Sequence, residues 1–201
     1  MDTEYFQFKH FVEETIEIVS LDLDAMEQIA EAGNYTTTTT QTTIRPGDEH
    51  LFTPETPKVS RCTIPIAMIC FSVIDMFGQW VNKFQDDDFA HSSTAFFERL
   101  AKKEDLKNPE ASQKFKEAFR HGIVHSFFAR QGFSITYPLF ESNTLFMSLN
   151  GTQATLDVKY LLKTVRLGMA ALKETLKDKE AELTQAIFSG YKRWLERQKA
   201  N

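Results

Sequence analysis

The chain has 201 residues, of which 42% are hydrophobic and 25% are charged, and it carries 18 phenylalanines and a net charge of −5. This is enough apolar material for a single domain over residues 1–201 with a core of its own. The acidic net charge argues against a general nucleic-acid coat or a binder of acidic membranes, so any polyanion would have to meet a local basic patch.

The N-terminal segment is predicted to be helical. From Tyr5 to about Val19, apolar side chains recur every three or four residues, as an amphipathic helix requires. Ser20-Leu21-Asp22 has the composition of a cap, which predicts a second short helix toward Ala32 that ends at Gly33-Asn34.

Residues 35–60 show no helical period. A run of threonines is followed by several prolines, and threonine favours extended backbone while proline interrupts helices. We expect a long loop or an irregular edge ribbon here.

A strongly apolar helix is predicted next, with Thr63 as its N-cap and an end near Phe84. Residues 64–81 are apolar enough to raise the question of a membrane span. Asp75 and Gln79 interrupt this run, so the prediction is a buried core helix rather than a segment in a membrane. Its aromatic side chains are expected in the core rather than on a base-stacking surface: Phe71, Phe77, Trp80 and Phe84.

The two cysteines, Cys62 and Cys70, are eight residues apart in one helical segment, which places them too far apart for a disulfide. They also lack the CxxC spacing of a zinc or redox site. Because no apolar leader follows Met1-Asp2-Thr3-Glu4, we expect the protein in the reducing cytoplasm.

Two further helix starts lie in the middle of the chain. Ser92 or Ser93 is expected to open one helix. Asn108-Pro109-Glu110 predicts a second start, with a cap, a proline in the first turn and a carboxylate at the positive end of the helix dipole. This second helix is expected to end at Gly132.

After Gly132, residues 133–137 and 145–149 alternate polar and apolar side chains around a polar link, which predicts a β-hairpin over 133–149. From about Leu156 the helical period returns and continues to Trp194, with a kink expected near Asp178. The predicted fold is therefore mainly α, an antiparallel helical bundle with a small β-hairpin insertion.

The helix that starts at Asn108 carries Arg120, His121, His125 and Ser126 in a largely apolar setting. A permanent cation beside imidazoles can hold a phosphate and move a proton. Arg120 and His125 are separated by roughly 140° around an ideal helix. A shared site therefore needs a distortion near Gly122 or two copies of the helix that meet across a symmetric interface. The alternative is structural, with a histidine at the edge of the core and an arginine paired with a carboxylate.

The Arg120-His121-x3-His125 pattern in a small helical bundle resembles the Arg-x4-6-His signature of the HEPN superfamily, in which a polar residue often follows the arginine. Ser126-Phe127-Phe128 and the earlier Ser72-x-Ile74-Asp75-x-x-Gly78 are similar to segments of bacterial HEPN-like proteins. The resemblance covers mainly residues 63–130. It implies a homodimer in which the motifs of two chains form one composite site.

Many HEPN proteins are metal-independent ribonucleases, often toxins or defence effectors with an antitoxin partner, and others only bind nucleotides or partners. The resemblance implies that His125 is the general acid or base for attack of an RNA 2′-hydroxyl on the adjacent phosphate, with no cofactor. Arg120 would stabilise charge on the phosphoryl oxygens, and His121 would orient the pair. A basic rim for RNA could come from these residues: Lys114, Lys116, Arg130, Lys192, Arg193 and Arg197.

Two other interpretations remain open at this stage. One is a non-catalytic HEPN-like interaction or nucleotide-binding module. The other is a metal-dependent enzyme, because Glu117, His121 and His125 are spaced by four residues and share one helical stripe that could ligate a metal. His91 or Asp75 could supply a fourth ligand.

Asp75 and Ser126 are candidate supporting residues. A carboxylate in an apolar helix must be paired or protonated. Asp75 could accept a hydrogen bond from His125 or Arg120, which would support catalysis. The structural alternative is an ion pair with one of three other cations: Arg61, Arg99 or Arg166.

Overall fold

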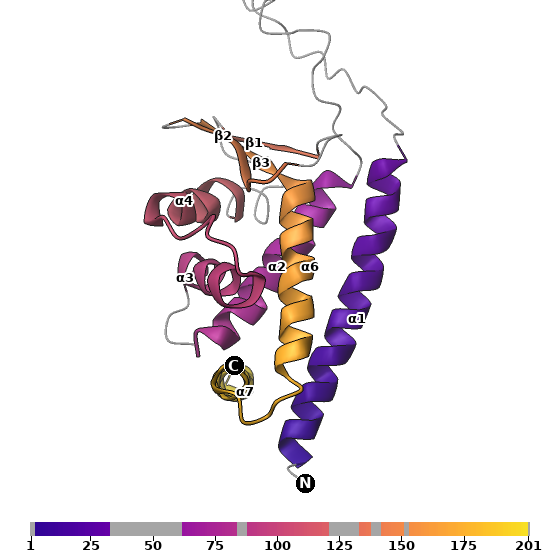
Figure 1. The fold of residues 1–201 in the computed structure, drawn as a ribbon, viewed down its shortest axis with the longest axis vertical. Helices are drawn as coiled ribbons and strands as arrows, with labels where there is room; N and C mark the ends of the chain where they lie inside the picture. Colours follow the sequence, from indigo (N-terminus) through magenta and orange to yellow (C-terminus); the bar gives the residue numbers. More distant parts are fainter. Residues whose placement is uncertain are drawn as a thin grey trace, which may run out of the picture.

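The computed structural model describes residues 3–32, 62–83, 88–120, 133–137, 142–150 and 153–200. This part of the chain is mainly helical, which confirms the predicted fold class (Figure 1). The helices are α1 (Thr3–Glu31), α2 (Thr63–Val81), α3 (Phe89–Ala95), α4 (Pro109–Lys114), α6 (Val158–Thr175) and α7 (Glu182–Ala200), with π-helical segments η2 (Phe96–Ala101) and η3 (Phe115–Arg120). The strands are β1 (Phe133–Thr136), β2 (Phe146–Asn150) and β3 (Gln153–Asp157). The threonine- and proline-rich segment 35–60 lies outside the described residues.

Helix α2 lies at the centre of the protein and packs against α1, α3, α6 and α7. Phe71, Phe77 and Trp80 are in the core as expected, each at most 1% exposed, and Phe84 lies outside the described residues. Thr63 is its first helical residue, and Cys62, which makes no side-chain cap bond, precedes it. Of the helices in the described part of the chain, α2 alone is long and apolar enough to cross a membrane, and 56% of its apolar window is buried inside the protein.

Two glycines allow other helices to approach α2 closely. A Cβ on Gly78 would lie 2.1 Å from the carbonyl oxygen of Ser92, at the start of α3. A Cβ on Gly190 of α7 would lie 2.2 Å from the carbonyl oxygen of Trp80. Neither distance is compatible with a side chain, so glycine is required at both helix contacts. Around this point the Trp80 ring contacts the aromatic rings of α1, α2 and α7: Phe8, Phe11, Phe77, Tyr191 and Trp194.

Helix α1 is one continuous helix of 29 residues, so the predicted break at residues 20–22 is wrong. Its buried side chains include Val12, Ile16, Leu23 and Ala30, which continue one stripe through that point. Burial of this stripe outweighs the weak preference of the Ser20-Leu21-Asp22 sequence for a cap, because a break would take Leu23 away from the core.

Helix α3 begins earlier than predicted, because Asp88 is its cap and accepts a hydrogen bond from the Ala90 amide at 3.0 Å. The Ser93 hydroxyl instead donates back to the Ala90 carbonyl at 3.0 Å. The start of α4 is confirmed, since Asn108 Oδ1 accepts from the Glu110 amide at 2.9 Å. Both helices continue into π-helical segments, which are rare and widen the helix locally.

The predicted β-hairpin over 133–149 is wrong in its pairing. The sheet has the order β1-β3-β2, so β3 lies between the two strands that were expected to pair. β1 pairs with β3 in parallel, and β2 pairs with β3 antiparallel. Ala154 and Leu156 of β3 are at most 2% exposed. Burial of these side chains explains why β3 is central, whereas the sequence predicts a return of the helical period from about Leu156.

The C-terminal helical region is divided, as expected, near Asp178. α6 ends at Thr175 and α7 begins at Glu182. The hydroxyl of Tyr5 in α1 donates to the Leu176 carbonyl at 2.9 Å at this break. Figure 1 shows α1 beside α6, whereas α7 is viewed end-on and crosses the other helices. The packing is therefore helical without being the regular antiparallel bundle that was predicted.

Candidate functional site

The predicted motif begins at the end of segment η3, whose last residue is Arg120. The Arg120 side chain and residues 121–132 lie outside the described residues. His121, His125 and Ser126 are among them, so the composite site stays a prediction. What the structure describes is the part of the helix that leads to the motif: α4 and η3 follow each other directly, and a π-helical turn ends at the arginine.

Two lysines of the predicted basic rim, which precede Arg120 in the sequence, are already in ion pairs. Lys114 Nζ lies 2.8 Å from Glu110 Oε1, and Lys116 Nζ lies 2.7 Å from Asp88 Oδ1. Partial burial tends to raise the pKa of Asp88, but hydrogen bonds from the Lys116 ammonium and the Ala90 amide outweigh it and hold this pKa below its ordinary value. The charge that these lysines could offer to a phosphate is therefore partly neutralised.

Asp75 lies in the apolar helix α2, as expected, and its side chain is only partly buried. Its Oδ1 accepts a hydrogen bond from Gln79 Nε2 at 3.0 Å. Two of its predicted structural partners have other contacts: Arg99 donates to the Val81 carbonyl at 3.2 Å, and Arg166 binds carboxylates of α1. The two polar residues that interrupt the apolar run of α2 are thus joined by a hydrogen bond one helical turn apart.

The predicted metal stripe is described only at Glu117, whose carboxylate is exposed and accepts a hydrogen bond from Gln113. His91, a suggested fourth ligand, is exposed on α3. Among the described residues, no group of three or more histidine, cysteine, aspartate or glutamate side chains is arranged to hold a metal ion. Cys62 and Cys70 are both free thiols, as the spacing predicted.

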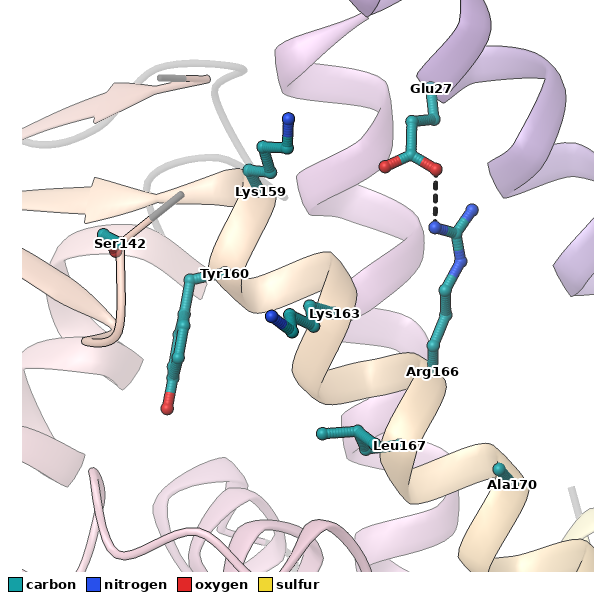
Figure 2. Close-up of a pocket in the computed structure, with 8 residues that line it drawn as sticks. All are labelled: Glu27, Ser142, Lys159, Tyr160, Lys163, Arg166, Leu167 and Ala170. Carbon is teal, nitrogen blue, oxygen red and sulfur yellow. Dashed lines mark hydrogen bonds and ion pairs between the residues drawn. The ribbon is translucent and has the colours of Figure 1, made fainter. Parts of the chain in front are cut away.

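A pocket that the sequence did not predict lies on the exposed face of α6 (Figure 2). Its volume is about 470 Å³, which is within the usual range for small-molecule sites. Helix α1 contributes one wall, and the segment before β2 contributes another. The lining residues are Glu27, Ser142, Lys159, Tyr160, Lys163, Arg166, Leu167 and Ala170.

Ion pairs between α1 and α6 form the back of this pocket. Arg166 binds Asp24 and Glu27, with nitrogen–oxygen distances of 2.5 Å to each. Lys159 Nζ lies 2.9 Å from Glu31 Oε1. Glu31 and Lys159 are at one end of the row, and Asp24 and Arg166 are at the other, so the two helices run antiparallel. We call these contacts the α1–α6 ion-pair row.

Two tyrosines beside the pocket are kept in the neutral form. Burial and the nearby carboxylates of Glu27 and Glu31 raise the pKa of Tyr137, whose hydroxyl donates to Glu27 Oε1 at 3.3 Å. Burial and the Asp105 carboxylate raise the pKa of Tyr160 to about 12, and its hydroxyl donates to Asp105 Oδ2 at 3.0 Å. Neither phenol is suited to act as a base near neutral pH.

The cations of the pocket have a regular spacing in the sequence. Lys159, Lys163 and Arg166 follow one another at spacings of four and three, so they share one face of a helix. The same spacing is typical of a solvated helix face, which is how charged helices are usually interpreted. Only the packing of α1 along this face distinguishes a walled pocket from ordinary surface.

Comparison with known proteins gave no match: no family model, curated protein or solved structure is detectably similar to this chain.

Proposed function

We propose that the protein is a HEPN-like, metal-independent endoribonuclease whose site is formed by Arg120, His121 and His125 of two chains. The observation that carries the proposal is the motif itself, placed directly after a helix with a well-formed start. Asn108 caps that helix, and a mainly helical fold surrounds it. Segment η3, which ends at Arg120, is π-helical, and π-helical turns occur frequently at functional sites.

In this mechanism the imidazole of His125 removes the proton from an RNA 2′-hydroxyl, and the 2′-oxygen attacks the adjacent phosphorus as the bond to the 5′-oxygen breaks. The leaving 5′-oxygen takes up a proton from water. The guanidinium of Arg120 stabilises the negative charge that develops on the phosphoryl oxygens. His121 orients the pair. The products are a 2′,3′-cyclic phosphate and a free 5′-hydroxyl, and no metal takes part in the step.

A mixed RNA pool incubated with the protein in EDTA tests the proposal. We expect cleavage that leaves 2′,3′-cyclic phosphate ends, and we expect Arg120→Ala and His125→Ala each to lower the rate by at least about 100-fold. His10→Ala is the matched control, because His10 is an exposed histidine on α1, far along the chain from the motif. Absence of cleavage by folded protein, or equal cleavage by all three variants, would contradict the proposal. Cleavage that EDTA abolishes would instead favour the metal stripe at Glu117, His121 and His125.

A second candidate function is a non-catalytic HEPN-like module that binds a nucleotide or a protein partner. The ion pairs of Lys114 and Lys116 favour this alternative, because they reduce the positive charge beside the motif in a protein whose net charge is −5. Binding of a mononucleotide by folded protein that does not cleave RNA, lost in Arg120→Ala, would support it over the ribonuclease.

A further inference from the structure

The pocket on α6 differs in charge from the rest of the protein. Lys159, Lys163 and Arg166 line it, and Glu27 is the one carboxylate among its lining residues, so the lining carries an excess of two positive charges. The whole chain has a net charge of −5. The buried Asp157 carboxylate caps the first turn of α6 and offsets the positive end of the helix dipole there. Asp24 and Glu31 lie behind this lining and pair with Arg166 and Lys159, so they offset the excess. The pocket therefore presents cationic N–H donors without a large net positive charge.

The ion-pair row does not use up the hydrogen-bonding capacity of these cations. A guanidinium has five N–H donors and an ammonium has three. Arg166 forms ion pairs with two carboxylates, and Lys159 forms an ion pair with one. Their side chains are 34% and 22% exposed. A ligand oxygen can join the row without breaking the contacts that hold α1 on α6.

The pocket also has an apolar side. Leu167 is 45% exposed, which is unusual for a leucine, and Ala170 lies about one turn further along α6. In Figure 2, Lys163 and Leu167 extend to the side of α6 that faces Tyr160 and Ser142, whereas Arg166 extends to Glu27. Because Lys163 and Leu167 are four residues apart, a charged end and an apolar surface lie about 6 Å from each other along the helix.

We propose that this pocket binds a small organic anion, in which a carboxylate or phosphate head contacts Lys159 and Lys163 and a short apolar body covers Leu167 and Ala170. Lysines bind such heads as point charges. A cationic head in the same position would face the ammonium groups of Lys159 and Lys163, and an uncharged ligand would gain only the apolar contact. This inference is independent of the ribonuclease proposal, because the pocket and the motif share no residue.

Titration calorimetry with octanoate and with octyl phosphate tests the proposal and distinguishes the two kinds of head. We expect one set of sites for at least one of these ligands, with an affinity at least about tenfold above that for octanol, acetate or inorganic phosphate. Octyltrimethylammonium should not bind. Equal binding of octanol and the two anions, or no binding of either anion at millimolar concentration, would overturn the proposal.

Two variants connect the binding to the pocket. Lys163→Gln keeps most of the stem but removes the charge, and we expect a loss of affinity of about threefold to fivefold, typical of a partly exposed ion pair. Leu167→Gln should weaken binding by about tenfold, because it removes an apolar contact. Lys173→Gln is the matched control, since Lys173 is exposed on α6 outside the pocket. If Lys163→Gln and Lys173→Gln bind equally well, the ligand does not occupy this pocket. RNA is absent from these measurements, so their outcome is separate from that of the cleavage assay.

Discussion

Helices α2 and α1 pack against each other but are held in the protein in different ways. α2 is surrounded by other helices, and most of its side chains are buried. α1 buries one stripe, while four of its large apolar side chains remain 50% to 64% exposed: Phe6, Ile18, Leu21 and Ile29. The second half of α1 is attached to α6 by the ion-pair row. Close packing is sensitive to every added atom, whereas ion pairs at a partly exposed surface are weak and depend on salt.

The largest effect is expected where α3 contacts α2. Gly78→Ala places a Cβ 2.1 Å from the Ser92 carbonyl oxygen, so the two helices must separate. We expect the free energy of unfolding to fall by about 2 to 3 kcal/mol in urea denaturation. Ser72→Ala, at an exposed position of the same helix, is the control. Equal stability of the two variants would show that α2 is packed no more tightly than α1.

A smaller effect is expected in the ion-pair row. Arg166→Gln removes both contacts to Asp24 and Glu27, and we expect a loss of about 1 kcal/mol at low ionic strength, because the residues are partly exposed. The difference from wild type should shrink as salt is added, since salt screens exposed charges. Lys173→Gln serves again as the exposed control. A difference that does not depend on salt would mean that Arg166 stabilises α1 by packing instead.

The smallest effect concerns pH. The pKa of Tyr137 is raised from 10.0 in the folded protein, chiefly by burial and then by Glu27 and Glu31 on α1. A group with a raised pKa stabilises the fold fully below its unfolded pKa, and this contribution is lost as pH rises above it. We therefore expect wild type to exceed Tyr137→Phe by less than about 1 kcal/mol at neutral pH, from one hydrogen bond. Denaturation at pH 8 to 11 should show this margin falling above pH 10; a constant margin would contradict the raised pKa.

Much of the helical fold could be predicted from the sequence, because the apolar residues that a helix buries recur every three or four positions. Asn108 and the break near Asp178 are local signals that the structure confirms. The continuity of α1 and the central place of β3 could not be predicted, since each depends on which distant surface covers a side chain such as Leu23 or Leu156. Local preference for a cap or a turn is small compared with such burial.

The two candidate sites also differ in how far the sequence alone predicts them. The Arg120-to-His125 motif is visible in the sequence because unlike chemical groups stand together among apolar residues. The pocket on α6 was not visible, because Lys159, Lys163 and Arg166 have the spacing of any solvated face. Its walls come from α1 and from Ser142, which are far from α6 in the sequence. A pocket formed by the packing of distant segments has no local pattern to reveal it.

The contacts at Gly78 and Gly190 both fall on the last two turns of α2. There α3 and α7 approach the same stretch of backbone, between Gly78 and Trp80. Local opening at this end would require three helices to separate together, whereas the start of α2 has no comparable contact among the described glycines. The protein should therefore open from its periphery, with the second half of α1 released before α3 or α7, and the end of α2 should be the last part to lose its structure.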